Sequence, residues 1–135
     1  MITEDYVSFE TAKLLKEKGF EYNPDESYWL IDTNNKMYWI SSIGAYDYVD
    51  VPTESFQRPK NGYRLITQAL AMKWLREVHN RYIEICIDNS HNFKDIVFRP
   101  AIYDKKLDCL WESDNFLTYK EACESAIKYC LKNLI

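Results

Sequence analysis

Glycine is scarce in this sequence of 135 residues, which contains only Gly19, Gly44 and Gly62. Three glycines at these spacings cannot form the phosphate-binding patterns G-x-x-x-x-G-K or G-x-G-x-x-G. Apolar runs are only a few residues long, far below the roughly 20 residues that a membrane-spanning helix needs. The N-terminal residues also lack the basic and apolar segments of a secretory signal. We therefore expect no nucleotide-binding glycine loop, no membrane segment and no signal peptide.

Cysteine and histidine are also few, with four cysteines, no C-x-x-C pair, and only His79 and His91 as histidines. Cys123 and Cys130 are seven positions apart on an expected helix, about 10 Å by the helical rise, whereas a disulfide needs Cα atoms within about 7 Å. We therefore expect reduced thiols, a cytoplasmic protein, and no metal site or other cofactor. His79 falls at an expected helix end, where a protonated imidazole suits the helix dipole.

Positive charge is in the minority, because 17 Lys and Arg face 21 Asp and Glu for a net charge of −4. Binding to a nucleic-acid backbone depends on clustered basic residues, so this balance disfavours a nucleic-acid partner. A composition of 47% hydrophobic and 28% charged residues is typical of a globular protein. The length suits a single globular domain spanning residues 1–135.

Apolar periodicity and capping residues predict three helices. The first covers residues 9–18, is capped by Ser8, and ends at Gly19 in a left-handed conformation. A T-x-x-E capping box at Thr118 begins the third, which extends towards the chain end. The second follows Thr67 and covers residues 68–78, with an expected buried stripe made of Leu70, Ala71, Trp74, Leu75 and Val78.

Alternating and aromatic-rich runs predict strands on both sides of the middle helix. Residues 28–31 and 37–40 flank an Asp- and Asn-rich turn, which predicts a hairpin. The alternation of residues 82–88, followed by residues 93–103 and 107–112, predicts an antiparallel meander with an irregularity at Pro100. The order α-β-β-loop-α-β-β-β-α favours an α+β fold, a mostly antiparallel sheet with three helices covering one face.

The most unusual stretch is residues 20–63, here called the aromatic–acidic region. It contains ten of the 21 aromatic residues, and seven acidic residues against three basic ones. Tyr and Trp give large contact areas at low entropic cost, which favours a surface for a protein partner or for self-association. The alternative is that these rings complete a thin core. The candidate binding residues are Trp29, Trp39, Tyr46, Asp47, Tyr48, Asp50, Arg58 and Lys60.

Three stretches, residues 4–20, 68–80 and 118–131, carry a resemblance that covers the three expected helices. Together they resemble a family of small uncharacterised proteins found in prophages and mobile elements of gut Bacteroidales. The aromatic–acidic region is largely unmatched. The resemblance implies a phage or mobile-element origin and a bacterial cytoplasmic setting, and it brings no catalytic residue.

Two alternatives to a non-catalytic, protein-binding accessory protein stay open. One is a small-ligand sponge for a nucleotide signal that counteracts host defence, with Arg58, Lys60 or Arg64 as phosphate partners. The other is a cysteine- or acid-dependent enzyme with Cys86 as nucleophile and His91 as base. The sequence favours no enzyme, because its carboxylates form no pair in an apolar setting that would separate two pKa values.

Overall fold

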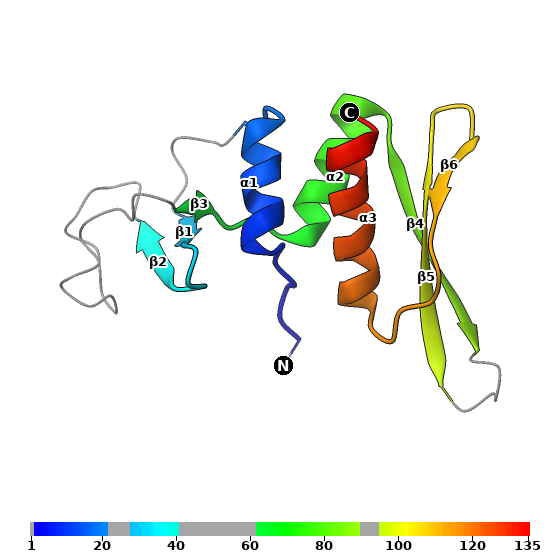
Figure 1. Ribbon diagram of the computed structural model, residues 1–135, viewed down its shortest axis with the longest axis horizontal. Helices are drawn as coiled ribbons and strands as arrows, with labels where there is room; N and C mark the ends of the chain where they lie inside the picture. Colours follow the sequence, from blue (N-terminus) through cyan, green and yellow to red (C-terminus); the bar gives the residue numbers. More distant parts are fainter. Residues whose placement is uncertain (1, 22–27, 41–61, 90–94) are drawn as a thin grey trace. The chain divides into compact units, whose positions relative to one another are not determined.

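The computed structural model describes residues 2–21, 28–40, 62–89 and 95–135. Within them the chain is of the α+β class, as predicted, and divides into two compact units, Val7–Ile66 and a unit formed by Met1–Tyr6 with Thr67–Ile135. Each unit has its own three-stranded antiparallel sheet. The elements (Figure 1) are α1 (Phe9–Glu17), β1 (Tyr28–Ile31), β2 (Met37–Ile40), β3 (Tyr63–Arg64), α2 (Gln68–His79), β4 (Tyr82–Asn89), β5 (Ile96–Tyr103), β6 (Cys109–Glu112) and α3 (Tyr119–Asn133).

Helix α1, in the unit of residues 7–66, begins and ends as its sequence predicts. The Ser8 Oγ accepts a hydrogen bond from the backbone N–H of Thr11 (3.2 Å). At the other end Gly19 has φ of +91°, and the Phe20 N–H donates to the Leu15 carbonyl (2.9 Å). This closing pattern is a Schellman motif. It turns the chain back over the helix, so that Leu15 and Phe20 are both buried.

The sheet of this unit has the strand order β2-β1-β3. The hairpin β1–β2 was predicted, whereas β3 lies in a segment predicted to be loop. Tyr63 and Arg64 pair with Ile31 and Leu30 of β1, and the Leu65 N–H donates to the Trp29 carbonyl (2.7 Å). A strand of two residues has no period that a sequence can reveal, so its place depends on pairing with a distant strand.

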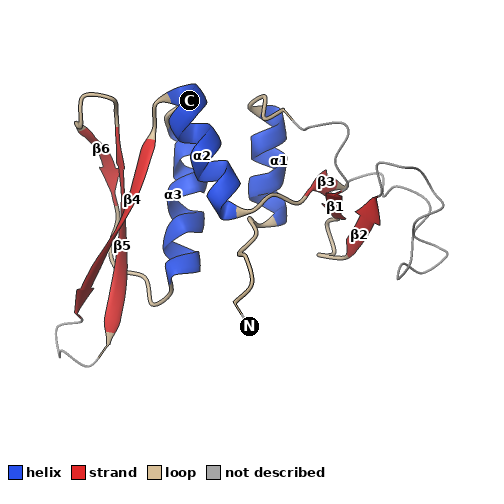
Figure 2. Ribbon diagram, turned by 180° about the vertical axis from the view of Figure 1, so that it is seen from behind, coloured by secondary structure: helices blue, strands red, loops and turns tan. Residues whose placement is uncertain are grey.

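In the other unit, α2 and α3 cover one face of the sheet β4-β5-β6 (Figure 2). The sequence predicts one sheet with three helices on one face, whereas the described strands form two sheets and α1 belongs to the other unit. Ile102 of the central strand β5 and Ile127 and Leu131 of α3 are completely buried. Trp111 of β6 stacks on Tyr129 of α3, with ring centroids 4.6 Å apart and planes inclined by 13°. Among the described residues, no helix combines the length and apolar character of a membrane span.

Pro100 does not interrupt β5, so the irregularity predicted there is wrong. Pro100 is buried opposite Ile85 of β4, and its carbonyl accepts the Ser113 N–H (3.0 Å) just past the end of β6. In an antiparallel strand the N–H and C=O of one residue point to the same side. The missing N–H therefore faces Ser113, just past the end of β6, and the ladder between β4 and β5 loses no hydrogen bond. The register shift lies instead between Ile102 and Tyr103.

The predicted apolar stripe of α2 is only half buried. Ala71 and Leu75 are completely enclosed, whereas Leu70 is 48% and Val78 is 58% exposed. Residues 71 and 75 share a helix face with Gln68, and residues 70, 74 and 78 form a neighbouring stripe. The prediction merged these two stripes, although only the first one packs into the core of this unit.

Candidate functional site

The strands β1 and β2, here called the aromatic strand pair, bring two predicted site residues together. Trp29 and Trp39 lie directly opposite each other in the register. Their ring centroids are 5.2 Å apart and the ring planes are inclined by 58°. Opposed residues of an antiparallel pair share one face of the sheet, so the two indoles form one surface. Both are half-buried, which leaves part of each ring open to contact.

The turn of this hairpin is fixed by Asp32. Its Oδ1 accepts the backbone N–H groups of Asn34 (2.8 Å) and Lys36 (2.9 Å), and its Oδ2 accepts the Tyr38 hydroxyl (3.1 Å). The hydrogen bond from the Lys36 N–H is the main reason why the pKa of Asp32 lies below its usual 3.8. Asn35 takes the left-handed conformation, with φ of +60°. This turn sets the register that places Trp29 opposite Trp39.

Cations lie over tyrosine rings around the aromatic strand pair. The Arg64 guanidinium is 4.4 Å from the ring centroid of Tyr28, and the Lys36 ammonium is 5.3 Å from that of Tyr38. Tyr28 and Tyr38 alternate with the two tryptophans along their strands, so they lie on the opposite face of the sheet. These cation–π contacts therefore lie on the face opposite the surface that the two indoles form.

Six of the predicted binding residues lie outside the described residues. They are Tyr46, Asp47, Tyr48, Asp50, Arg58 and Lys60. The short strand that residues 49–51 suggest lies outside them too. The nucleotide-binding alternative therefore stays a prediction, because it depends on Arg58 and Lys60, although Arg64 is placed over Tyr28.

The enzyme alternative is tested only in part, because His91 lies outside the described residues. The Cys86 thiol donates to Glu84 Oε1 (3.7 Å) on the face of β4 turned away from the helices. Within the described chain, no group of three or more His, Cys, Asp or Glu side chains is placed to hold a metal ion. The predicted pairing of Cys86 with His91 thus stays a prediction.

His79 differs from the protonated helix-end residue that the sequence suggests. Its ring meets the edge of Trp74 at 4.6 Å, and its Nε2 is buried with no hydrogen-bond partner among the described residues. Burial, and secondly the charge of Arg81, lower the pKa of His79 below 6.5. The imidazole is therefore neutral at pH 7. The helix is closed instead by Asn80 in the left-handed conformation, with φ of +54°.

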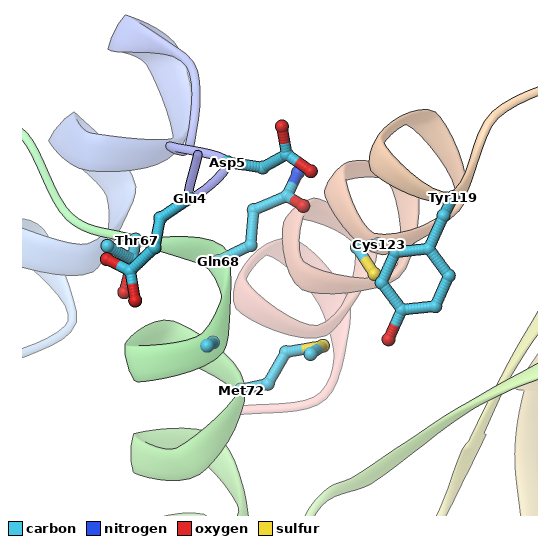
Figure 3. Close-up of a pocket in the computed structure, with 8 residues that line it drawn as sticks. Glu4, Asp5, Thr67, Gln68, Met72, Tyr119 and Cys123 are labelled. Carbon is cyan, nitrogen blue, oxygen red and sulfur yellow. The ribbon is translucent and has the colours of Figure 1, made fainter. Parts of the chain in front are cut away.

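A small pocket lies in the unit formed by residues 1–6 and 67–135, and the sequence reasoning missed it. Its volume is about 160 Å³. Figure 3 shows Asp5 and Gln68 on one side, Tyr119 and Cys123 of α3 on the other, and Met72 between them. The lining residues are Glu4, Asp5, Thr67, Gln68, Ala69, Met72, Tyr119 and Cys123.

Gln68 links the two helices that form the pocket. Only 3% of Gln68 is exposed, and its Nε2 donates to the Lys120 carbonyl (2.9 Å) and to Glu124 Oε2 (3.4 Å). Its backbone N–H donates to the Asp5 carbonyl (2.9 Å), which ties the N-terminal segment to the start of α2. A signal for this role was present, because Gln68 shares the helix face of Ala71 and Leu75.

The opposite wall of the pocket carries a phenol and a thiol. Burial raises the pKa of the Tyr119 hydroxyl and of the Cys123 thiol, so both groups are neutral at pH 7. The Tyr119 hydroxyl and the Cys123 thiol also share a hydrogen bond. The ring of Tyr119 rests edge-on against Phe98 of β5, at 5.9 Å between centroids. The sheet thus holds this wall in place.

No protein-family model matches the chain, and no curated protein and no solved structure is significantly similar to it.

Proposed function

We propose that this chain is a non-catalytic binding protein of phage or mobile-element origin that recognises a protein partner through the aromatic strand pair. The observation that carries the proposal is the Trp29–Trp39 pair, two indoles 5.2 Å apart that both keep exposed surface. Tryptophan contributes much of the binding energy where interfaces are best packed, because it covers a large area and has few rotamers to lose. The resemblance of the helices to prophage proteins supports the origin and a bacterial cytoplasmic setting.

The backbone of β2 favours an extended partner segment. Among the described residues β2 pairs only with β1, so the sheet β2-β1-β3 ends at β2. A peptide can extend such a sheet by main-chain hydrogen bonds, while side chains of the receiving strands provide specificity. The Trp29–Trp39 pair lies next to this edge and is suited to that second role.

The charge of the aromatic–acidic region favours a positively charged segment. The region has seven acidic and three basic residues, so its charge of −4 equals that of the whole chain. Arg64, just beyond the region, and Lys36 within it lie over Tyr28 and Tyr38, so tyrosine rings on the opposite face of this strand pair already attract cations. Opposite charge increases the rate of association and discriminates against acidic partners.

The decisive experiment compares partners retained by variants of the immobilised chain. Wild type, Trp39→Ala and Tyr82→Ala are incubated with bacterial lysate, and the retained proteins are quantified by mass spectrometry. Tyr82 is the matched control, because it is a half-buried aromatic residue at a strand position of the other unit. We expect at least one protein that wild type and Tyr82→Ala retain and that Trp39→Ala loses by about tenfold or more.

Stability and self-association are measured on the same proteins. The thermal midpoint of Trp39→Ala should stay within a few degrees of wild type, and a collapse would mean that the indole is part of the core. Sedimentation equilibrium of the chain alone shows whether the partner is a second copy. The proposal fails if no retained protein depends on Trp39 and the chain shows no Trp39-dependent association with itself.

A further inference from the structure

The two edges of the sheet β4-β5-β6 differ in how well they are protected against further pairing. The edge strand β6 has four residues, and a register shift interrupts its pairing with β5. The other edge strand, β4, has eight residues, pairs with β5 without interruption, and contains no proline, lysine or arginine. Among the described residues β4 has no second neighbouring strand. Long, regular edges of this kind pair readily with another strand, and natural proteins usually shorten, bend or charge them.

We propose that β4 pairs antiparallel with β4 of a second copy of the chain, which joins the two three-stranded sheets into one. The strand belongs to the unit formed by residues 1–6 and 67–135, so this pairing is independent of the aromatic strand pair in the other unit. Three features of β4 support a second copy as the occupant of the edge. They are the direction of its free backbone groups, a self-complementary row of isoleucines, and the positions of its two carboxylates.

The free backbone groups of β4 belong to its isoleucines. Pro100 of β5 lies opposite Ile85, and its carbonyl accepts the Ser113 N–H from the other side of β5. The N–H and C=O of one residue point to the same side of an antiparallel strand, so Ile85 and Pro100 form a non-hydrogen-bonded pair. The N–H and C=O of Ile85 therefore point to the free edge. Because these directions alternate, the same groups of Ile83 and Ile87 point there too.

The isoleucine side chains share one face of β4 and are incompletely covered by their own unit. Ile83 and Ile85 are half-buried, and Ile87 is 70% exposed. An antiparallel pair centred on Ile85 places Ile85 opposite its own copy and Ile83 opposite Ile87. Two-fold symmetry forms the second of these contacts twice. Cross-strand contacts between β-branched side chains stabilise a sheet, so pairing gives the exposed Ile87 an apolar neighbour.

The carboxylates of β4 favour this register over its neighbours. Glu84 and Asp88 lie on the other face of β4, together with Tyr82 and Cys86. Pairing centred on Ile85 places Glu84 opposite Cys86. It places Asp88 opposite Tyr82, so no two carboxylates meet. Centring the pair on Glu84 would oppose the two copies of Glu84, and centring it on Cys86 would oppose Glu84 and Asp88. Like charges directly opposite each other destabilise a sheet.

Disulfide cross-linking of the full chain tests this register directly. With Cys109 replaced by serine, Cys86 is the only cysteine that is not buried. Glu84→Cys then adds a thiol that the pairing places opposite Cys86 of the other copy. Non-hydrogen-bonded pairs have Cα atoms about 4.5 Å apart, a separation that a disulfide spans. We expect oxidation to convert most of the protein to a covalent dimer on a non-reducing gel.

Asp88→Cys, with the same Cys109→Ser change, is the matched control. Asp88 and Glu84 are both exposed carboxylates, and each lies two residues from Cys86 on the same face of β4. In the proposed register position 88 faces Tyr82 of the other copy, so oxidation should give about tenfold less covalent dimer. Equal yields from the two variants would assign the cross-link to random collision and overturn the inference.

Sedimentation equilibrium measures the association without cross-links. Ile87→Lys removes a largely exposed side chain and places a charge on the edge strand, so it should weaken dimerisation about tenfold or more. Ile96→Lys is the control, because Ile96 is 57% exposed at the same end of the hairpin but lies on the central strand β5. It should associate like wild type. Circular dichroism at low concentration shows whether both variants are folded.

Trp39→Ala separates this pairing from the proposed function, because it should leave the association through β4 unchanged. The inference is overturned if wild type stays monomeric at the highest concentration reached, or if its association depends on Trp39 and not on Ile87. It is also overturned if Ile96→Lys weakens the dimer as much as Ile87→Lys does. A lysate experiment without a Trp39-dependent partner would count against the proposed function alone.

Discussion

Replacing Leu107 with asparagine should stabilise the unit that contains β5 and β6. Leu107 lies in the turn between these strands with φ of +66°, and its side chain is 78% exposed. The left-handed conformation costs an L-residue about 1–2 kcal/mol, and asparagine tolerates it better because its side chain is short and polar. An exposed leucine loses little packing when it is replaced. We therefore expect a gain of about 0.5–1 kcal/mol and a rise of about 2–4 °C in the thermal midpoint.

The chain contains a matched turn that shows which residue this position prefers. Asp32 and Asp104 hold equivalent turns, because each Oδ1 accepts the backbone N–H groups two and four residues later, at 2.8–3.0 Å. The left-handed position is Asn35 in the first turn and Leu107 in the second. Asn35→Leu should therefore destabilise the hairpin β1–β2 by an amount similar to the gain from Leu107→Asn.

Urea and thermal unfolding, followed by circular dichroism, measure both changes. A Leu107→Asn variant with an unchanged or lower midpoint would refute the reasoning, because the leucine side chain would then contribute more than its backbone strain costs. Opposite signs for the two substitutions would support it. Leu107→Ala is the control, because it removes the same side chain and keeps an ordinary L-residue at the strained position. It should gain less than asparagine does.

Two further predictions concern titrating groups. Ellman's reagent at pH 8 should label the accessible Cys86 and Cys109 quickly, and Cys123 and Cys130 only after unfolding. Burial raises the pKa of Cys130 from 9.0 to about 11. Only about a thousandth of this thiol is therefore ionised at pH 8. Rapid labelling of all four cysteines in the folded protein would contradict the described core. The pKa of Asp32 is lowered by hydrogen bonds to the backbone of its turn, so its stabilising effect is complete above the unfolded value of 3.8 and is lost as the pH falls through the lower folded value. Asp32→Asn should therefore flatten the dependence of the thermal midpoint on pH in this acidic range, and an unchanged pH dependence would count against the turn.

Features set by local chemistry could be predicted from the sequence. Thr67 and Thr118 accept the backbone N–H groups of Leu70 and Glu121 at 3.1 Å, as their places before the helices suggest. Caps and tight turns involve residues within a few positions of one another, so a short stretch of sequence contains all the groups that take part. The placement of Trp29 opposite Trp39 could be predicted for the same reason, because the five-residue turn between their strands sets the register of the hairpin.

Features set by distant contacts could not be predicted. The strand β3 and the division into two sheets depend on pairing between segments far apart in the chain. Ile87 continues the alternation of Ile83 and Ile85, and yet it is 70% exposed, because the hairpin end of β4 and β5 extends beyond α3 (Figure 1). Periodicity predicts which residues share a face, but it does not predict how far a covering helix reaches. The pocket was missed because Gln68 reaches its partner in α3 across 52 positions of sequence.

The connectivity of the chain makes the pocket depend on the unit of residues 7–66. Asp5 and Gln68 are joined by a backbone hydrogen bond of 2.9 Å, although this whole unit lies between them in the sequence. Closing a flexible loop of this length would cost about 4 kcal/mol in chain entropy. The folded unit removes most of this cost, because its own ends are joined by the hydrogen bond from the Val7 N–H to the Ile66 carbonyl (2.9 Å). A substitution that unfolds residues 7–66, such as Leu15→Ala in the core of that unit, should therefore also weaken the hydrogen bond between the Gln68 N–H and the Asp5 carbonyl. Faster hydrogen exchange of the Gln68 amide would report this loss, although no residue of the pocket is changed.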